Sequence, residues 1–555
     1  MPILEERHKV VQKHVDMLFT KRRPLLLLYQ EMAENLYPER ADFTYQRRLG
    51  AEFADYLTTS VPALIRRDLA NQIHATLRPP GQQWFKMTVQ QEDIDNDSQR
   101  WLEAKTKVMM RAMSDRQSRF TRATKEADHD FAAFGQAVLS VEANMRTSTL
   151  LYRSWHLRDV VWCERYDGSI GTIGRKWKPY ARDLISIFGE GNVSPQVLNA
   201  VKNNNGADAY KEINCLHIIV PSEDYDYNYP VAKKFPYISL FIDTDNKFVM
   251  EEKGRDTPYY IIPRWQTVSG SQYAYSPATV VALPDARLLQ AITFTLLKAG
   301  EKAVDPPMIA VEEMVKSPID IRAGGVIWVD ADYDEKTGEV LRPMTVDGRG
   351  IPTGLNMQES LISTLRSAFY LDKLNLPVMG PEMTAYEVSQ RIQEYIRQAI
   401  PLFSPIEEEY NAPLCEQTFQ VLLKVGTFGS AYDIPPAIQG QGVRFKFESP
   451  LVEADDAKLA QTYNIAAQMI AQAAAADPVA AQMIDTEVAL RDALRSAGTP
   501  AKWLRSEDDM AQRAAQVQQQ QAAMQQAQLV EQQGNAGQSV GNAAATMQKV
   551  INGNA

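Results

Sequence analysis

Apolar residues recur three and four positions apart over much of the first 150 residues, and this spacing predicts amphipathic helices. The stripe Leu57, Val61, Leu64, Ile65, Leu69 and Ile73 is one example. It stops at Arg78-Pro79-Pro80-Gly81, because proline cannot continue a helix. A second helical block is expected from Gln99 to about Asn144. The chain is therefore expected to open with helices that bury one face.

Between Leu150 and Arg264 the pattern changes to β-branched and aromatic runs separated by turn residues, which predicts strands. Asp167-Gly168 lies between two such runs and is a hairpin signal, since a type I′ turn needs positive φ at both central positions. The segment from Asp243 to Lys247 separates two further runs in the same way. The sequence therefore predicts an antiparallel β layer set among helices.

A long helix is expected to begin at Ser276-Pro277, with serine as the N-cap and proline at the first helical position. Its apolar stripe continues through Leu288 and Leu296, and Asp305-Pro306-Pro307 ends it. Pro284 lies near its start and is expected to bend it.

A short β-rich insert is expected to follow, from Met308 to about Pro352, with a second helix from Met357 to Tyr370. Between Glu301 and Gly350 there are 11 acidic and six basic residues. Two helices are thus expected to bracket a small acidic insert, as in a stalk with a tip.

The last third of the chain begins with a proline- and glycine-rich loop after residue 371. Thr384 and Glu387 then form a capping box that starts a long helix, and Pro401 interrupts it, so we expect a kinked or broken helix over 385–424. A short strand is expected over 443–447. Beyond it the chain is rich in Ala and Gln, which supply 24 of the 45 residues from 511 to 555, and the last twenty or so are expected to be disordered.

The overall composition is that of an ordinary globular protein with several structural units, since 45% of the 555 residues are apolar and 23% are charged. There are 59 basic and 69 acidic residues, giving a net charge of −10, which argues against a protein that coats DNA phosphates over its whole surface. One local exception is the stretch from Arg100 to Lys125, which has eight basic and two acidic residues. It forms either a solvated basic face or a surface that contacts phosphates.

The sequence contains no recognisable catalytic or metal-binding pattern. There is no GxxxxGK[ST], HExxH or GxSxG sequence, the six histidines are scattered, and the cysteines Cys163, Cys215 and Cys415 lie far apart. The run Glu407-Glu408-Glu409 is expected in the first turn of a helix, where the helix dipole explains it. The longest aliphatic run, Leu25 to Leu28, is much shorter than a membrane span. We expect no enzyme, no metal, no cofactor, no export signal and no membrane segment.

Several segments, taken in their order along the chain, point to a known family. They are LYPERADFT, VPALIRRDLANQIHATLRPPGQQWFKMTV, FGQAVLSVE, PYYIIPRW followed by YSPATVVALPDARLLQ, MTAYEVSQRIQEY, and the Gln/Ala-rich end. With these the chain resembles, over about residues 20 to 530, the portal or head-to-tail connecting protein of short-tailed bacteriophages, the podoviruses.

The resemblance implies an α+β, predominantly helical portal fold that assembles as a ring. The implied parts are a wing (1–275 and 384–450), two stem helices (276–303 and 355–371), a clip (304–354), a tunnel loop (372–383), a crown and barrel (451–530) and a tail (531–555).

The implied function is a conduit at one capsid vertex, usually made of twelve copies, through which double-stranded DNA is packaged and later ejected. The implied partners are the major capsid and scaffolding proteins, the large subunit of terminase, which binds transiently, and the tail adaptor and nozzle proteins. The ring would assemble in the host cytoplasm and remain in the virion, without enzymatic activity or membrane contact.

The resemblance also implies that the tunnel-loop residues Lys373, Asn375 and Met379 face DNA. Lys373 is the one basic residue of that segment, so a ring of copies would touch phosphates sparsely in an otherwise acidic bore that lets DNA slide. An exposed loop lysine or an ion pair between subunits is the alternative for Lys373. The apolar stripes of the stem helices are expected to pack subunits together. Two other classes stay open: a metal-dependent DNA-processing enzyme, and an internal virion or scaffolding protein.

Overall fold

The computed structural model describes the residues 4–48, 50–79, 81–90, 95–144, 149–202, 208–226, 229–310, 315, 317–319, 328–330, 341–344, 350–374, 405–430, 433–447, 462–472, 485–505, 509–510 and 512–524. The chain divides into two compact units. The first comprises Met1–Trp84 and Met109–Thr427, and the second comprises Phe85–Val108 and Phe428–Ala555. Each unit is described by itself.

The N-terminal part of the first unit is helical, as predicted. Its helices are α1 (Leu4–Lys21), α2 (Arg23–Leu36), α3 (Val61–Leu77) and α5 (Phe120–Phe134), and α4 (Asn96–Ser114) ends in this unit. Helix α3 stops immediately before the predicted turn at Arg78-Pro79-Pro80. Ile65, Leu69 and Ile73 of the predicted stripe are buried, whereas Leu64 is exposed.

The predicted helical block from Gln99 to about Asn144 is confirmed up to Phe134 and is wrong in its last ten residues. Helix α5 ends at Phe134, and the following residues enter strand β2 (Leu139–Asn144). Gly135 ends the helix with a φ of 73° and donates its N–H to the carbonyl of Phe131. A Cβ at this position would lie 2.0 Å from the backbone carbon of Tyr275, so only glycine allows the two segments to approach this closely.

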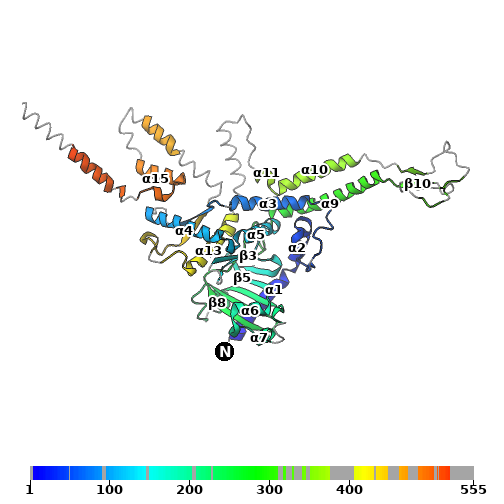
Figure 1. The fold of residues 1–555 in the computed structure, drawn as a ribbon, viewed down its shortest axis with the longest axis horizontal. Helices are drawn as coiled ribbons and strands as arrows, with labels where there is room; N and C mark the ends of the chain where they lie inside the picture. The colour runs from blue at the N-terminus through cyan, green and yellow to red at the C-terminus, as the bar shows by residue number, and fades with distance from the viewer. Residues whose placement is uncertain are drawn as a thin grey trace, which may run out of the picture. The chain divides into compact units, whose positions relative to one another are not determined.

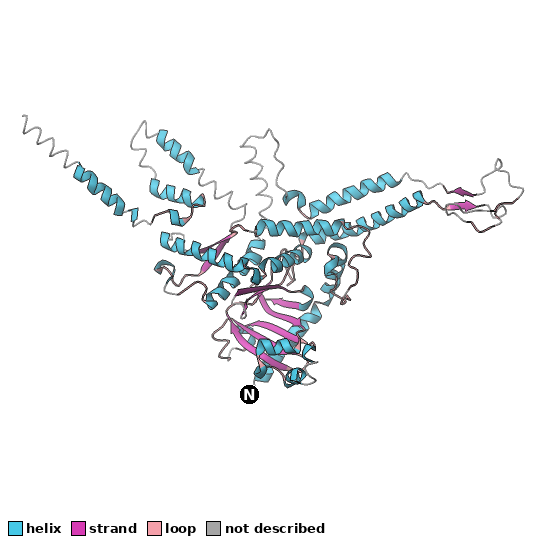
Figure 2. Cartoon of the chain, in the orientation of Figure 1, coloured by secondary structure: helices cyan, strands magenta, loops and turns pink. Residues whose placement is uncertain are grey.

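The predicted antiparallel β layer is present and forms two sheets, visible as the magenta strands in Figure 2. The larger sheet has the order β4-β5-β6-β7-β8, and the smaller has the order β3-β2-β9. The strands are β3 (Thr149–Ser154), β4 (Val160–Glu164), β5 (Ile170–Trp177), β6 (Cys215–Pro221), β7 (Tyr237–Asp243), β8 (Phe248–Arg255) and β9 (Tyr260–Ile261). Both predicted hairpins are confirmed, with Gly168 at a φ of 81° in the first and Lys247 at 54° in the second.

Each face of the five-stranded sheet carries its own apolar core. On one face Val11, Val15 and Leu18 of α1 pack against strand residues that include Ile218 and Leu240. On the other face α6 (Ala181–Phe188) and α7 (Pro195–Lys202) pack against Cys215 and Met250. Neighbouring strand residues alternate between the two cores, as the two-residue period of a strand requires. The short helix α8 (Ser222–Tyr225) follows β6.

The predicted long helix is confirmed as α9 (Pro277–Val304), and Ser276 caps it by accepting a hydrogen bond from the N–H of Thr279 at 3.3 Å. Helix α10 (Gly350–Ala368) begins seven residues before the predicted start at Met357. The two helices run side by side, and beyond α9 the strands β10 (Met308–Ala310) and β11 (Leu341–Pro343) pair in antiparallel fashion (Figure 1). By length and composition alone, α9 is long and apolar enough to cross a membrane. In its most apolar 18-residue stretch, 22% of the residues are buried.

The second unit contains a strand that the sequence analysis missed. Strand β1 (Phe85–Val89) pairs with β12 (Val443–Phe447), the predicted strand, in an antiparallel register. Helix α15 (Thr486–Ser496) is in the same unit, and residues 462–472 and 512–524 are also helical.

In the first unit, α11 (Leu371–Leu374) follows α10, and a π-helix (Glu407–Asn411) leads into α13 (Ala412–Val425). The predicted kink in 385–404 and the tail after 530 lie outside the described residues.

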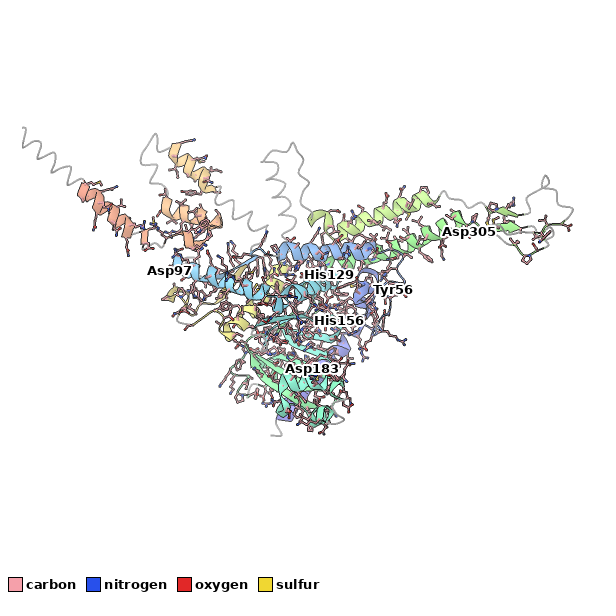
Figure 3. The ribbon with its side chains drawn as sticks, in the orientation of Figure 1. Tyr56, Asp97, His129, His156, Asp183 and Asp305 are labelled. Atoms are coloured by element: carbon pink, nitrogen blue, oxygen red, sulfur yellow. The ribbon has the colours of Figure 1, made fainter. Side chains whose placement is uncertain are left out.

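Two buried histidines make the stability of this fold depend on pH. Burial, together with the charges of Arg175 and Arg255, holds the pKa of His217 well below its ordinary value near 6.5. Burial and the charge of Arg66 lower the pKa of His129, which Figure 3 labels on α5, to about 4. The folded protein therefore keeps both rings neutral, whereas the unfolded chain binds protons below about pH 6.5.

We accordingly predict that these two histidines leave the free energy of unfolding unchanged above about pH 7 and lower it as the pH falls from 7 to 5. His217 alone should account for about 2 kcal/mol of this loss, and His129 adds to it in the same direction. Urea titrations at pH 7 and pH 5 measure the difference, and the variant His217→Gln should reduce it. Equal stability at the two pH values would show that these rings are not neutral inside the fold.

Candidate assembly and channel surface

The middle of helix α9 is fixed to the chain segment before α3 by the side chain of one glutamine, Gln290. The Gln290 side-chain oxygen accepts hydrogen bonds from the backbone N–H groups of Thr58 at 2.9 Å and Thr59 at 3.0 Å, and from the Thr58 hydroxyl at 2.7 Å. Its amide nitrogen donates to the Thr59 carbonyl at 2.8 Å, and the Thr58 hydroxyl also lies 2.9 Å from the Gln290 carbonyl. All of these groups are partly buried, so the contact fixes both the position and the rotation of α9.

One face of α9 is packed inside the first unit. Ala278, Ala282, Ala286 and Leu289 are fully buried, and the helix contacts α2, α5 and α10. The small alanine side chains let the neighbouring helices approach closely. Further along, Gln358 of α10 donates a hydrogen bond to the Thr293 hydroxyl at 3.2 Å.

The opposite face of α9 carries an uncovered apolar stripe. We call it the outer stripe of α9, and it consists of Val281, Pro284, Leu288, Ala291 and Thr295, all of which are exposed. Val281 is 61% exposed and Leu288 is 46% exposed. The spacing of the five positions is three, four, three and four residues, which is the pattern of the a and d positions of helices that pack side by side on one another. No charged residue interrupts it, so this face is suited to packing against another helix.

The predicted tunnel-loop residues can be placed only in part. Lys373 belongs to α11, which follows α10 directly, but its side chain is not described, and Asn375 and Met379 lie outside the described residues. The hydroxyl of Ser367 donates to the carboxylate of Asp372 at 2.7 Å and so ties the start of α11 to the end of α10. A hollow of about 550 Å³ adjoins this point, with Leu64 and Asp68 of α3, Arg366 of α10 and Leu371 among its lining residues.

The π-helix, at the other end of the segment 375–404, is held by an arginine. The Arg264 guanidinium binds both carboxylate oxygens of Glu409 at 3.0 Å, and it also reaches Glu164 and the Gly168 carbonyl at 3.0 Å. Burial lowers the pKa of Arg264, but the hydrogen bonds and the charge of Glu409 outweigh it and leave that pKa raised. The helix dipole is therefore not the only explanation of the acidic run at 407–409. Arg264 fixes Glu409 to the β4–β5 hairpin.

A second ion pair, which is fully buried, holds the same π-helix. Arg78 and Asp128 form a salt bridge that is inaccessible to solvent, His74 lies 2.8 Å from the same carboxylate, and Arg78 also donates to the side-chain oxygen of Asn411 at 2.6 Å. Burial raises the pKa of Asp128, but the charge of Arg78 and the hydrogen bond from His74 lower that pKa by a larger amount. The pKa is therefore below its ordinary value, and Asp128 stays ionised. The sequence shows no signal of this pair, because its members are 50 residues apart.

Histidines that the sequence analysis treated as structural are engaged with other side chains. His156 lies 2.7 Å from Asp42, and His217 contacts the hydroxyls of Tyr260 at 2.5 Å and Ser239 at 2.9 Å. Within the described part of the chain, no three His, Cys, Asp or Glu residues are arranged to hold a metal ion.

Comparisons with known proteins identify the family of the chain. The family model described as bacteriophage head to tail connecting protein matches residues 8–504, so the chain belongs to that family. The probable portal protein of Bordetella phage BPP-1 is 23% identical over 470 residues, which is 82% of this chain and 80% of that protein. The portal protein of Salmonella phage epsilon15 is 22% identical over 443 residues, covering 77% and 76%.

A solved structure described as the virion of a native gene transfer agent particle contains a chain with 11% identity and a TM-score of 0.33, covering 76% of this chain and 87% of that one. That score is too low to support an inference. Family membership is enough to confirm the resemblance that the sequence showed. The chain is a phage portal protein by family, a structural component of the virion at the junction of head and tail.

We predict that replacing Arg264 with Met destabilises the first unit by about 2–3 kcal/mol, because Glu409 and Glu164 then keep their charges without a partner. Thermal or urea unfolding measures the change. The matched control is Lys202→Met, which removes a salt bridge to Glu190 whose two side chains are 58% and 64% exposed. That change should cost less than about 0.5 kcal/mol. An equally small effect of both substitutions would mean that the Arg264 contacts do not hold the π-helix.

Proposed function

We propose that copies of this chain close into a ring, and that double-stranded DNA passes from head to tail through its centre. The observation that carries this proposal is the outer stripe of α9. A helix whose opposite face is already packed presents five apolar or uncharged positions at coiled-coil spacing, and all five are exposed among the described residues. Another copy of the chain is the partner that is present wherever this protein is made.

Ring closure follows from the way such a contact is made. The outer stripe of one copy meets a different surface of the next, so the contact is heterologous, and heterologous contacts close into rings when the rotation between copies divides a full turn. The family resemblance implies twelve copies, and that number remains part of the proposal.

A protein partner explains α9 better than a membrane does. The helix carries Arg287, which pairs with Glu31 of α2, and Lys298 near its far end. The neighbouring helix α10, which runs alongside α9, exposes Glu359 and Arg366. Moving these charges into lipid would cost free energy. They are compatible with a pair of helices that contacts protein on one side and water on the other.

The charge of the chain suits a passage that does not hold DNA. Each copy has a net charge of −10, so most of the surface repels phosphates, and a ring multiplies each charge that faces the passage. Lys373, which belongs to α11, and Asn375 and Met379 further along the chain remain our proposed contacts with the moving duplex. Lys373 would touch phosphates briefly without gripping the duplex.

The proposal also includes the finer assignments implied by the family. The ring would sit at one vertex of a short-tailed phage, bind capsid and scaffolding proteins during assembly in the host cytoplasm, dock terminase, and then hold the tail adaptor and nozzle. The arm formed by α9 and α10 would be the stem, and the strands β10 and β11 would belong to the clip. The wing, tunnel loop and crown would occupy the ranges given above.

We predict that the purified protein forms rings with a central hole in negative-stain images. The variant Leu288→Lys should stay folded, because this side chain is exposed in the single chain, but it should lose the rings, because a charge would be buried at each contact between copies. The matched control is Ile187→Lys on α6, where a 58% exposed side chain lies outside the stripe. Intact rings in the Leu288→Lys variant would remove the outer stripe from the assembly contact.

We predict that Lys373→Glu leaves rings intact but reduces the amount of packaged DNA per particle, since a ring of carboxylates repels the duplex. Quantitative measurement of encapsidated DNA in a complementation assay tests this. Lys373→Arg preserves the charge and should package normally. Normal packaging by the Glu variant would show that Lys373 does not face the DNA.

A further inference from the structure

Five exposed basic residues stand within a stretch of fifteen residues that runs from the end of α4 into the first half of α5. We call this set the basic corner, and it consists of Arg111, Arg116, Arg119, Arg122 and Lys125, each of which is exposed. Between residues 109 and 125 they are accompanied by a single acid, Asp115, so the net charge of the stretch is +4 in a chain whose total is −10. All five belong to the first unit.

Nearby carboxylates are engaged elsewhere and do not neutralise the basic corner. On α5, Glu126 and Asp130 both pair with Arg40, and Asp128 pairs with Arg78 and His74. Asp115 accepts a hydrogen bond from the backbone N–H of Gln117 at 2.7 Å. None of the five basic residues forms an ion pair with a carboxylate in the part of the chain that is described.

Buried contacts of Ser118 and Phe120 hold the backbone of the basic corner in place. The buried hydroxyl of Ser118 donates to the carbonyls of Met113 and Asp115 at 2.6 Å. The ring of Phe120 packs against Tyr152 with centroids 5.0 Å apart. Arg119, between these two anchors, has a φ of 56°, in the left-handed region that few non-glycine residues adopt. The basic side chains therefore project from a fixed backbone.

The position of these charges does not favour the helix that carries them. Arg119 is the N-cap residue of α5 and Arg122 lies in its first turn, where the positive end of the helix dipole disfavours cations. Local stability therefore does not explain why basic residues stand here, whereas an external anion would gain from both the side chains and the dipole.

The spacing of the charges matches a phosphate backbone. Arg122 and Lys125 are three residues apart and share a face of α5, and with Arg119, the residue before the helix, they span about 9 Å of its axis. Phosphates of one DNA strand follow each other every 3.4 Å along the duplex axis, so about three of them lie within this length. Four of the five basic residues are arginines, whose planar guanidinium groups bind phosphate oxygens in pairs.

The surface lacks what a protein partner would use. Among the described residues, no large apolar side chain between Leu64 and Tyr166 is exposed, whereas the centre of a protein–protein interface is depleted of charge and enriched in aromatic groups. We propose that the basic corner binds the phosphate backbone of double-stranded DNA, as a contact separate from the tunnel-loop residues. The contact goes beyond the proposed conduit, because it holds DNA and does not merely let it pass.

The test uses the full-length protein and a fluorescently labelled 30-base-pair duplex of arbitrary sequence, with binding measured by anisotropy at 50 and 200 mM NaCl. If the wild-type protein contacts about four phosphates, its affinity should fall about 100-fold between these concentrations. The variant with Arg111, Arg116, Arg119, Arg122 and Lys125 all changed to Gln should bind at least about tenfold more weakly at 50 mM and show little dependence on salt. Circular dichroism verifies its fold, which loss of cations from a helix N-terminus should not harm.

A matched control removes the same charge elsewhere in the first unit. Its five substitutions to Gln are at the exposed residues Lys9, Lys13, Lys178, Lys211 and Lys253. This control should bind DNA within about threefold of wild type. Equal losses in the two variants would overturn the proposal, because net charge alone would then explain binding. Unchanged binding in the basic-corner variant would overturn it as well.

Two further measurements separate other outcomes. Polyglutamate at equal total charge should not displace the duplex, and displacement would show that the corner is a site for acidic protein. Negative-stain images of the same samples report ring formation independently. Loss of rings with retained DNA binding would contradict the proposed ring and leave the basic corner supported. Intact rings without salt-dependent binding would overturn the basic corner alone.

Discussion

The assembly that we propose for this protein depends on one surface, the exposed outer stripe of α9. Gln290 fixes the rotation of the helix, and buried alanines commit the opposite face to the first unit, so the helix cannot turn to bury both faces. Val281 and Leu288 therefore remain in water until another chain covers them. The exposed apolar surface of one copy is the favourable free energy available for assembly.

Ion pairs decide which charges of this protein are left without a partner. Arg264 and Arg78 bind the carboxylates of Glu409 and Asp128, and these two contacts anchor the π-helix that precedes α13. The same kind of pairing removes the acids of α5 from its outer surface, and the basic corner is left without a counter-charge from them. A chain of net charge −10 thus carries a locally cationic surface at the basic corner.

Local signals in the sequence were sufficient wherever a structural feature is encoded by neighbouring residues. Ser276-Pro277 predicted the start of α9, Asp167-Gly168 predicted a hairpin, and the family resemblance was confirmed. Strand β1 was missed because its partner β12 is more than 350 residues away and stabilises it by pairing, not by local propensity. Helix α5 was predicted too long because the contact between Gly135 and Tyr275 is equally non-local. The salt bridge between Arg264 and Glu409 had no signal in the sequence, because its two residues are also far apart along the chain.

The mass of the native assembly tests the central claim most directly. If the outer stripe of α9 joins each copy to the next in a closed ring, native mass spectrometry of the wild-type protein will show a single discrete multiple of 62.4 kDa, and no ladder of open oligomers. A species of 62.4 kDa alone, at concentrations and salt conditions where the chain is folded, would contradict the account.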